Sequence, residues 1–255
     1  MKFKYIFICV TALILNSCKH ETYLYKIEGK QINISDSLET NAEIDAFIKP
    51  YREHVSNDLD SVLAYSVGTY SKNDGELNSA IGNLFADAVL EEANPIFKSR
   101  TGHDIDIVLL NHGGIRSIIS KGDVTLRTAY ELMPFENSAV VVKLKGKQIQ
   151  EMIDYLIRAK TAHPISGMKI LLDKDFKLTS ATINGKPFDI NKTYFVATND
   201  YLYMGGNNMD FFKTNDSLYI LDYKIRNILI DYFSKKDTLN PVIDDRFIQL
   251  KNQLQ

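Results

Sequence analysis

The stretch IDIVLL, residues 105–110, is an almost continuous apolar run. Such a run is typical of a strand that is buried on both faces of a sheet. The stretches SAVVVKLK (138–145) and TYFVATND (193–200) also predict strands, while residues 79–93 and 146–160 show the apolar spacing of amphipathic helices. Because helices and strands mix without strict alternation, the sequence favours an α+β fold: a single domain with a mixed β-sheet flanked by helices.

Local signals predict where several of these elements begin and end. Ser79 and Thr125 each precede a helical pattern and are expected to cap its N-terminus. Pro50 lies inside a third helical pattern and predicts a helix that is kinked or split there. Asn184 and Gly185 form a strong tight-turn signal between the strands on either side of them.

Composition excludes some classes of function. The formal net charge of the 255 residues is −2, so no overall basic surface for a nucleic acid polymer is expected. Only Cys9 and Cys18 are present, and both lie near the N-terminus. The folded part is therefore expected to have no disulfide, no cysteine metal site and no cysteine nucleophile.

The N-terminus has the features of an export signal. Two lysines precede an apolar run that is too short to span a bilayer. Leu15 and Ser17 match the pattern that precedes the modified cysteine of bacterial lipoproteins, whereas Asn16 is unusual there. Residues 1–18 are thus interpreted as a lipoprotein signal peptide with Cys18 as the lipidation site. A plain secretory signal and an uncleaved anchor are the alternatives.

The boundaries that follow from this interpretation are simple. Residues 19–37 are polar and show no clear period, so they are expected to form a tether. Residues 38–255 are expected to form the folded domain. The protein would then lie in the cell envelope, anchored by lipid to a membrane at the periplasm or outer membrane.

The first candidate site follows the buried strand at residues 105–110. Asn111 can both donate and accept hydrogen bonds, as needed to bind the edge of a base. Gly113 and Gly114 allow a ligand to approach the backbone closely, and Arg116 carries a guanidinium suited to phosphate or carboxylate. Since short glycine motifs are weak signals, a tight turn with an ion-paired arginine is the alternative.

Two further loops carry aromatic and amide residues. One follows the end of a predicted helix and the other follows a predicted strand. An aromatic ring from each loop can hold a flat ring between them, with each stack worth about 1–3 kcal/mol. Either aromatic could instead belong to the core. The candidate binding residues of these loops are Phe135, Asn137, Tyr201, Gly205, Gly206 and Asn207.

Signals for catalysis are missing. The five histidines form none of the spacings typical of metal ligands, and no serine-nucleophile or phosphate-loop motif is found. We therefore assign no catalytic residue and no metal ligand. The three loops together suit a purine and a sugar better than they suit bond cleavage.

Four stretches, in order, carry a family resemblance: GNLFADAV, NHGGIR, ELMPFENSAVVVKLKG and TNDYLYMGGNNMDFF. They resemble the C-terminal domain of the 5′-nucleotidase / UDP-sugar hydrolase family, over roughly residues 40 to 250. The resemblance implies a two-domain enzyme, in which an N-terminal metallophosphoesterase domain holds two metal ions. The C-terminal domain grips the nucleoside.

The resemblance also implies roles for single residues. Asn111 would contact the base and Arg116 the phosphate side. Phe135 would form one face of an aromatic clamp, and Tyr201 the other, where the family usually has phenylalanine. Asn137 matches a polar residue near the base.

Other positions depart from the family. The loop of Gly205 and Gly206 would lie by the ribose, but the acidic residue that follows in the family is Asn207 here. An amide binds a hydroxyl without charge assistance. Gly75 stands near the place of a further substrate arginine. These departures would weaken phosphate binding more than base binding.

The sequence therefore predicts the nucleoside- or nucleotide-binding half of a split envelope 5′-nucleotidase. A separate metallophosphoesterase would be its partner and would hold the divalent metals, so no cofactor is expected in this chain. The alternative from another class is a degenerate structural or interaction lipoprotein that has lost its ligand. A stand-alone enzyme that uses unrecognised residues is the third interpretation.

Overall fold

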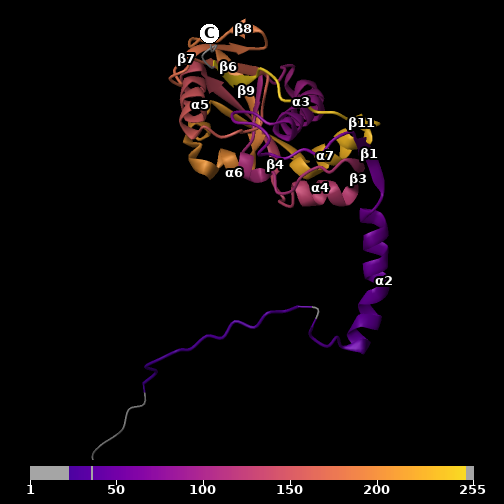
Figure 1. Ribbon diagram of the computed structural model, residues 1–255. Helices are drawn as coiled ribbons and strands as arrows, with labels where there is room; N and C mark the ends of the chain where they lie inside the picture. Colours follow the sequence, from indigo (N-terminus) through magenta and orange to yellow (C-terminus); the bar gives the residue numbers. More distant parts are fainter. Residues whose placement is uncertain (1–22, 36, 251–255) are drawn as a thin grey trace, which may run out of the picture. The chain divides into compact units, whose positions relative to one another are not determined.

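The computed structural model describes residues 23–35 and 37–250 of the chain (Figure 1). The chain divides into two units, Met1–Ile48 and Lys49–Gln255. In the first unit, residues 23–35 of the predicted tether are exposed and form neither helix nor strand. The predicted signal peptide, including Cys18, lies outside the described residues.

Helix α2 (Ala42–Leu59) includes the last residues of the first unit and the first residues of the second, and it excludes the split that was one of the two outcomes predicted at Pro50. It is a single helix with Pro50 inside it, and it is not split there. Proline removes one backbone hydrogen bond from a helix. None of the residues of α2 is buried, so water can satisfy the carbonyl that Pro50 leaves free.

The second unit contains the remaining helices and strands (Figure 1). In chain order they are β1 (Val62–Ser66), α3 (Ala80–Thr101), β2 (Ile107–Leu109), η1 (His112–Gly114), β3 (Gly122–Thr125), α4 (Leu126–Leu132), β4 (Ser138–Lys145), α5 (Gly146–Ala159), β5 (Ile165–Ser166), β6 (Met168–Leu172), β7 (Leu178–Ile183), β8 (Lys186–Pro187), β9 (Thr193–Asn199), α6 (Asp200–Tyr203), η2 (Gly206–Asn208), η3 (Asp210–Phe212), β10 (Ser217–Lys224), α7 (Ile225–Ser234), β11 (Thr238–Leu239) and β12 (Phe247–Gln249).

The strands form three sheets in place of the one mixed sheet that the sequence predicted. Their orders are β11-β1-β3, β10-β4-β9-β2-β5 and β12-β6-β7-β8, and each combines parallel with antiparallel pairs. The turn at Asn184 and Gly185 joins β7 to the short strand β8, whereas β9 belongs to the five-stranded sheet. The α+β class is confirmed, with helices and mixed sheets in one folded domain.

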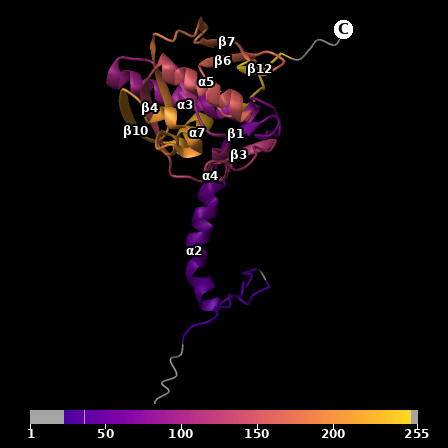
Figure 2. The same cartoon turned by 90° about the vertical axis from the view of Figure 1, so that its left-hand side faces the viewer.

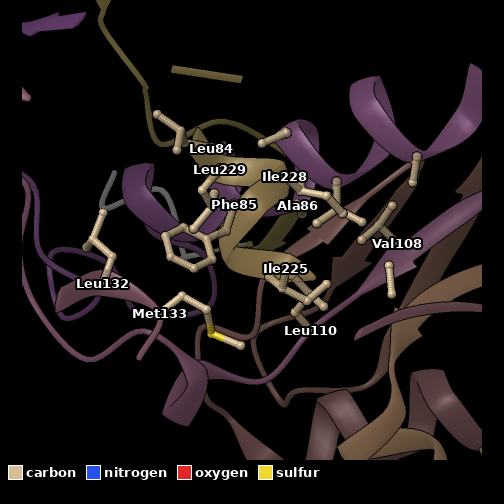
Figure 3. Close-up of a cluster of buried hydrophobic side chains, with 14 of the residues drawn as sticks. Leu84, Phe85, Ala86, Val108, Leu110, Leu132, Met133, Ile225, Ile228 and Leu229 are labelled. Atoms are coloured by element: carbon tan, nitrogen blue, oxygen red, sulfur yellow. The ribbon is translucent and has the colours of Figure 1, made fainter. Parts of the chain in front are cut away.

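The five-stranded sheet is buried on both faces, as the apolar run at β2 predicted. Val108 packs into the cluster formed with α3 and α7, whereas Ile107 and Leu109 pack into the cluster formed with α5. Figure 3 shows side chains of α3 and α7 meeting around Val108 and Leu110. On the other face, β6, β7 and β12 of the four-stranded sheet share a cluster with α5 (Figure 2). Successive strand residues point to opposite faces, so both faces need apolar residues.

Both predicted helix caps are confirmed. The Ser79 hydroxyl accepts a hydrogen bond from the Gly82 N–H at 3.2 Å, and Thr125 forms a capping box with Thr128. Helix α3 runs further than its apolar pattern suggested and ends at Thr101, where Gly102 caps it with a φ of 76° in the left-handed region. These caps fix the helices that support the central sheet.

Candidate functional site

Three loops meet at one edge of the five-stranded sheet. β2 runs parallel to β9, with Val108 paired to Ala197, so both strands end at this edge. β4 runs antiparallel to β9, with Ala139 paired to Asn199, so β4 begins there. Helix α6 contacts β4 and β9 at the same edge (Figure 1). Strand register therefore brings together segments that are far apart in the sequence.

The three loops enclose a cavity of about 380 Å³. Eight of the ten predicted binding residues line it: Asn111, Gly113, Gly114, Arg116, Phe135, Asn137, Tyr201 and Asn207. The other two, Gly205 and Gly206, lie between Tyr201 of α6 and Asn207 of η2 but do not line the cavity. Their role in ligand binding stays a prediction, as it does for all ten residues.

Asn111 is held in place at the edge of the cavity, where its side chain is 8% exposed. Its Nδ2 donates to Oδ1 of Asn207 at 3.2 Å, which joins the first loop to the third. A Cβ on Gly114 would lie 3.0 Å from the Oδ1 of Asn111, and one on Gly113 would lie 3.4 Å from its Nδ2. The two glycines therefore leave the room that the amide occupies.

Two aromatic side chains line the cavity from separate loops. Phe135 is 40% exposed and Tyr201 is 47% exposed, so neither belongs to the core. A Cβ on Gly206 would lie 2.4 Å from Cε1 of Tyr201, which shows that the ring lies directly against this glycine. The Cζ of Arg116 lies 5.8 Å from the centre of the Phe135 ring. Exposed rings of this kind offer stacking faces to a flat ligand.

The loop that carries Phe135 is fixed by ion pairs. The Glu136 carboxylate pairs with Arg226 of α7, and its second oxygen lies 3.0 Å from the Nζ of Lys224. The hydrogen bond from Arg226 lowers the pKa of Glu136. The Arg226 guanidinium in turn lies over the ring of Tyr130, 4.3 Å from its centre. These contacts anchor the Phe135 loop to the start of α7.

Two residues that support the cavity loops, Tyr155 and His163, were not among the predicted site residues. The Tyr155 hydroxyl on α5 donates to the Asn207 carbonyl at 3.0 Å. His163 is 4% exposed, and its Nδ1 accepts from the His112 N–H at 3.2 Å. Burial lowers the pKa of His163 to about 4, so the ring is neutral and able to accept. These contacts join segments about fifty residues apart, so no local sequence pattern indicated them.

The cavity lining carries a single positive charge. Arg116 is the only charged residue among the eight, and no carboxylate lines the cavity. Across residues 23–35 and 37–250, no three histidine, cysteine, aspartate or glutamate side chains lie together as a group that could hold a metal ion. A cavity with two aromatic faces, three amides and one guanidinium suits a flat ligand that carries a negative group.

Comparison with known proteins decides the family. The family described as "5′-nucleotidase, C-terminal domain" matches residues 54–214, which is more than half of the chain. The chain belongs to this family. All three loops of the cavity fall inside the matched region.

Two curated proteins and one solved structure illustrate what the chain is similar to. The chain is 24% identical to an apyrase of Tabanus yao over 233 residues, which cover 82% of this chain and 42% of the apyrase. It is 27% identical to a cell wall protein of Listeria monocytogenes over 209 residues, covering 73% of this chain and 26% of that protein. The crystal structure of a 5′-nucleotidase precursor from Thermus thermophilus has the same fold, with a TM-score of 0.68 at 23% identity over 82% of this chain and 44% of that one. The chain thus spans less than half the length of these relatives.

Within residues 23–35 and 37–250, every helix is too short or too polar to span a bilayer.

Proposed function

We propose that this chain is the nucleoside- or nucleotide-binding half of a split 5′-nucleotidase in the cell envelope. The observation that supports this most is the cavity at the sheet edge, where Phe135 and Tyr201 offer two exposed rings. The chain has the C-terminal, 5′-nucleotidase-type fold, and all three cavity loops lie in the matched region. A cavity of about 380 Å³ is of the size that small-molecule sites have.

Each lining residue has a proposed part in binding. The base would stack between Phe135 and Tyr201, and the amides of Asn111 and Asn137 would bind its polar edge. Asn207 would accept or donate a hydrogen bond at the ribose. Arg116 would pair with a negative group of the ligand, because its guanidinium has no carboxylate partner in the described chain.

Cleavage would belong to a separate metallophosphoesterase that holds divalent metal ions. The lining of the cavity offers no carboxylate or histidine as a general base, so this chain would select and orient the substrate. We further propose that Cys18 carries lipid and that residues 19–37 tether the domain to a membrane. The existence of a relative in a bacterial cell wall supports an envelope location.

The test is calorimetric titration of adenosine, AMP and UDP-glucose into the full-length protein in detergent. We expect saturable binding of at least one ligand, and loss of that binding in Tyr201→Ala without loss of folding. Tyr65→Ala is the matched control, since Tyr65 is 44% exposed and does not line the cavity. If none of the three ligands binds, a degenerate lipoprotein that has lost its ligand explains the chain better.

A further inference from the structure

A second cavity, of about 260 Å³, shares no lining residue with the three-loop cavity. Its lining comes from α3, from the end of α7 and from the segment that follows α7 through β11. Most of the lining residues come after residue 214, where the family match ends. The cavity therefore lies largely outside the matched region.

Asn83 of α3 brings to this lining a buried acceptor without a donor. The residue is 3% exposed, and its Nδ2 donates to the Asn78 Oδ1 and to the Val242 carbonyl, each at 2.9 Å. The Val242 carbonyl can only accept, so it fixes which end of the Asn83 amide is nitrogen. Within residues 23–35 and 37–250, the Oδ1 of Asn83 has no hydrogen-bond partner. A buried acceptor in this state is unfavourable, so a ligand that donates a hydrogen bond to it is favoured.

Every charged side chain of this lining already has a counter-ion. Asp87 forms a bidentate pair with Arg246, with N–O distances of 2.9 and 3.0 Å. The Nζ of Lys236 lies 2.8 Å from the Glu91 carboxylate. Because these charges are compensated within the protein, a ligand gains little by carrying a charge of its own. The lining therefore favours a neutral ligand.

Two more neutral polar groups of the lining remain for a ligand. Asn240 uses its Oδ1 to accept from the Tyr70 hydroxyl at 3.1 Å, but its Nδ2 makes no hydrogen bond within the described chain. The same holds for the hydroxyl of Tyr232, whose ring is half-buried. A hydroxyl group on a ligand can complement all three positions, because it both donates and accepts. The Tyr232 ring adds an apolar face for C–H groups.

We propose that this second cavity binds a neutral, hydroxyl-rich small molecule, namely a monosaccharide in its ring form. The sugar hydroxyls would donate to Asn83 and bind Asn240 and Tyr232, while a C–H face would lie on the Tyr232 ring. Sites for drug-sized ligands have volumes of about 300–1,000 Å³, so a cavity of about 260 Å³ fits a smaller molecule of this kind. The inference does not depend on nucleotide binding at the three-loop cavity.

The test is saturation-transfer NMR on the full-length protein in a detergent without a sugar headgroup. The probes are glucose, galactose, mannose and N-acetylglucosamine, with sorbitol as an open-chain comparison. We expect at least one sugar to bind in the millimolar range and more tightly than sorbitol. AMP at high concentration should leave the sugar signal unchanged, because the two cavities share no residue.

Two variants remove single groups of the cavity without disturbing its support. Tyr232→Phe removes only the hydroxyl, and Asn240→Asp keeps the oxygen that Tyr70 binds but removes the Nδ2 donor. Asn83 is left in place because its Nδ2 also holds Val242. Each variant should weaken sugar binding about fivefold, the effect of one hydrogen bond. Tyr219→Phe is the matched control and should bind like the wild type, since Tyr219 lies on β10 and does not line the cavity.

Other results would overturn the inference in distinguishable ways. Absence of binding by every sugar would show that the cavity holds only water. Loss of the sugar signal on addition of AMP would place the sugar in the three-loop cavity. Unchanged affinity in both Tyr232→Phe and Asn240→Asp would exclude this lining, and equal binding of sorbitol would exclude recognition of a ring. Thermal unfolding of each variant separates these outcomes from a loss of folding.

Discussion

Gly206→Ala should damage the candidate site by moving the Tyr201 ring. The added Cβ would lie 2.4, 2.5 and 2.7 Å from the Cε1, Cζ and Cδ1 atoms of that ring. Carbon atoms in contact prefer about 3.5–4.0 Å, so the ring must shift by about 1 Å or more. The backbone at Gly206 lies outside the positive-φ region that L-residues avoid, so the substitution acts on the ring and not on the turn.

The size of the effect follows from the loss of one stacked face. A base–aromatic stack contributes about 1–3 kcal/mol, which corresponds to an affinity loss of about 5- to 150-fold. Because Tyr201 is 47% exposed, the displaced ring can move into solvent and the fold should remain stable. AMP affinity by calorimetry and the thermal midpoint by circular dichroism measure the two quantities separately.

A double-mutant cycle makes this reasoning refutable. In a Tyr201→Ala background the ring is absent, so Gly206→Ala should cause no further loss of affinity. Wild-type affinity in Gly206→Ala would contradict the role of the ring. Losses that add in the double variant would show that Gly206 acts through something other than Tyr201.

Two further predictions concern the buried histidine beside the cavity and the proposed contact with the ribose. The lowered pKa of His163, about 4, means that the unfolded state binds more protons between about pH 4 and 6.5, so stability is lost as the pH falls through this range. Between pH 7 and 5 the loss should be about 2 kcal/mol by urea unfolding, and a His163→Asn variant should lack this part of the pH dependence; an unchanged slope would refute the assignment. Asn207→Asp should bind adenosine about fivefold more tightly through charge-assisted hydrogen bonds, but should not change the affinity for 2′,3′-dideoxyadenosine. Equal changes for both ligands would contradict contact between residue 207 and the ribose.

The central strands and the residues that line the cavity could both be predicted from the apolar runs in the sequence. Strands β2, β4 and β9 are buried on both faces, and burial of this kind produces a run of apolar residues that can be recognised in the sequence. Loops that follow or precede such strands meet at a sheet edge, which is why eight of the predicted residues line one cavity. The caps at Ser79 and Thr125 depend on their own side chains and were equally visible.

Features that depend on contacts between segments far apart in the sequence could not be predicted. Strands such as β8 (Lys186–Pro187) and β11 (Thr238–Leu239) are too short to have a period, and pairing with other segments creates them. The same holds for the bond from Tyr155 to Asn207. Helix α2 continues through Pro50 because exposure to water makes the missing bond tolerable.

The most direct test of the account is a crystal structure of the protein with AMP at saturating concentration. We expect the adenine ring between Phe135 and Tyr201, with the AMP phosphate within hydrogen-bond distance of the Arg116 guanidinium. AMP bound elsewhere, or a cavity that holds no AMP at saturating concentration, would contradict the proposed role of these residues.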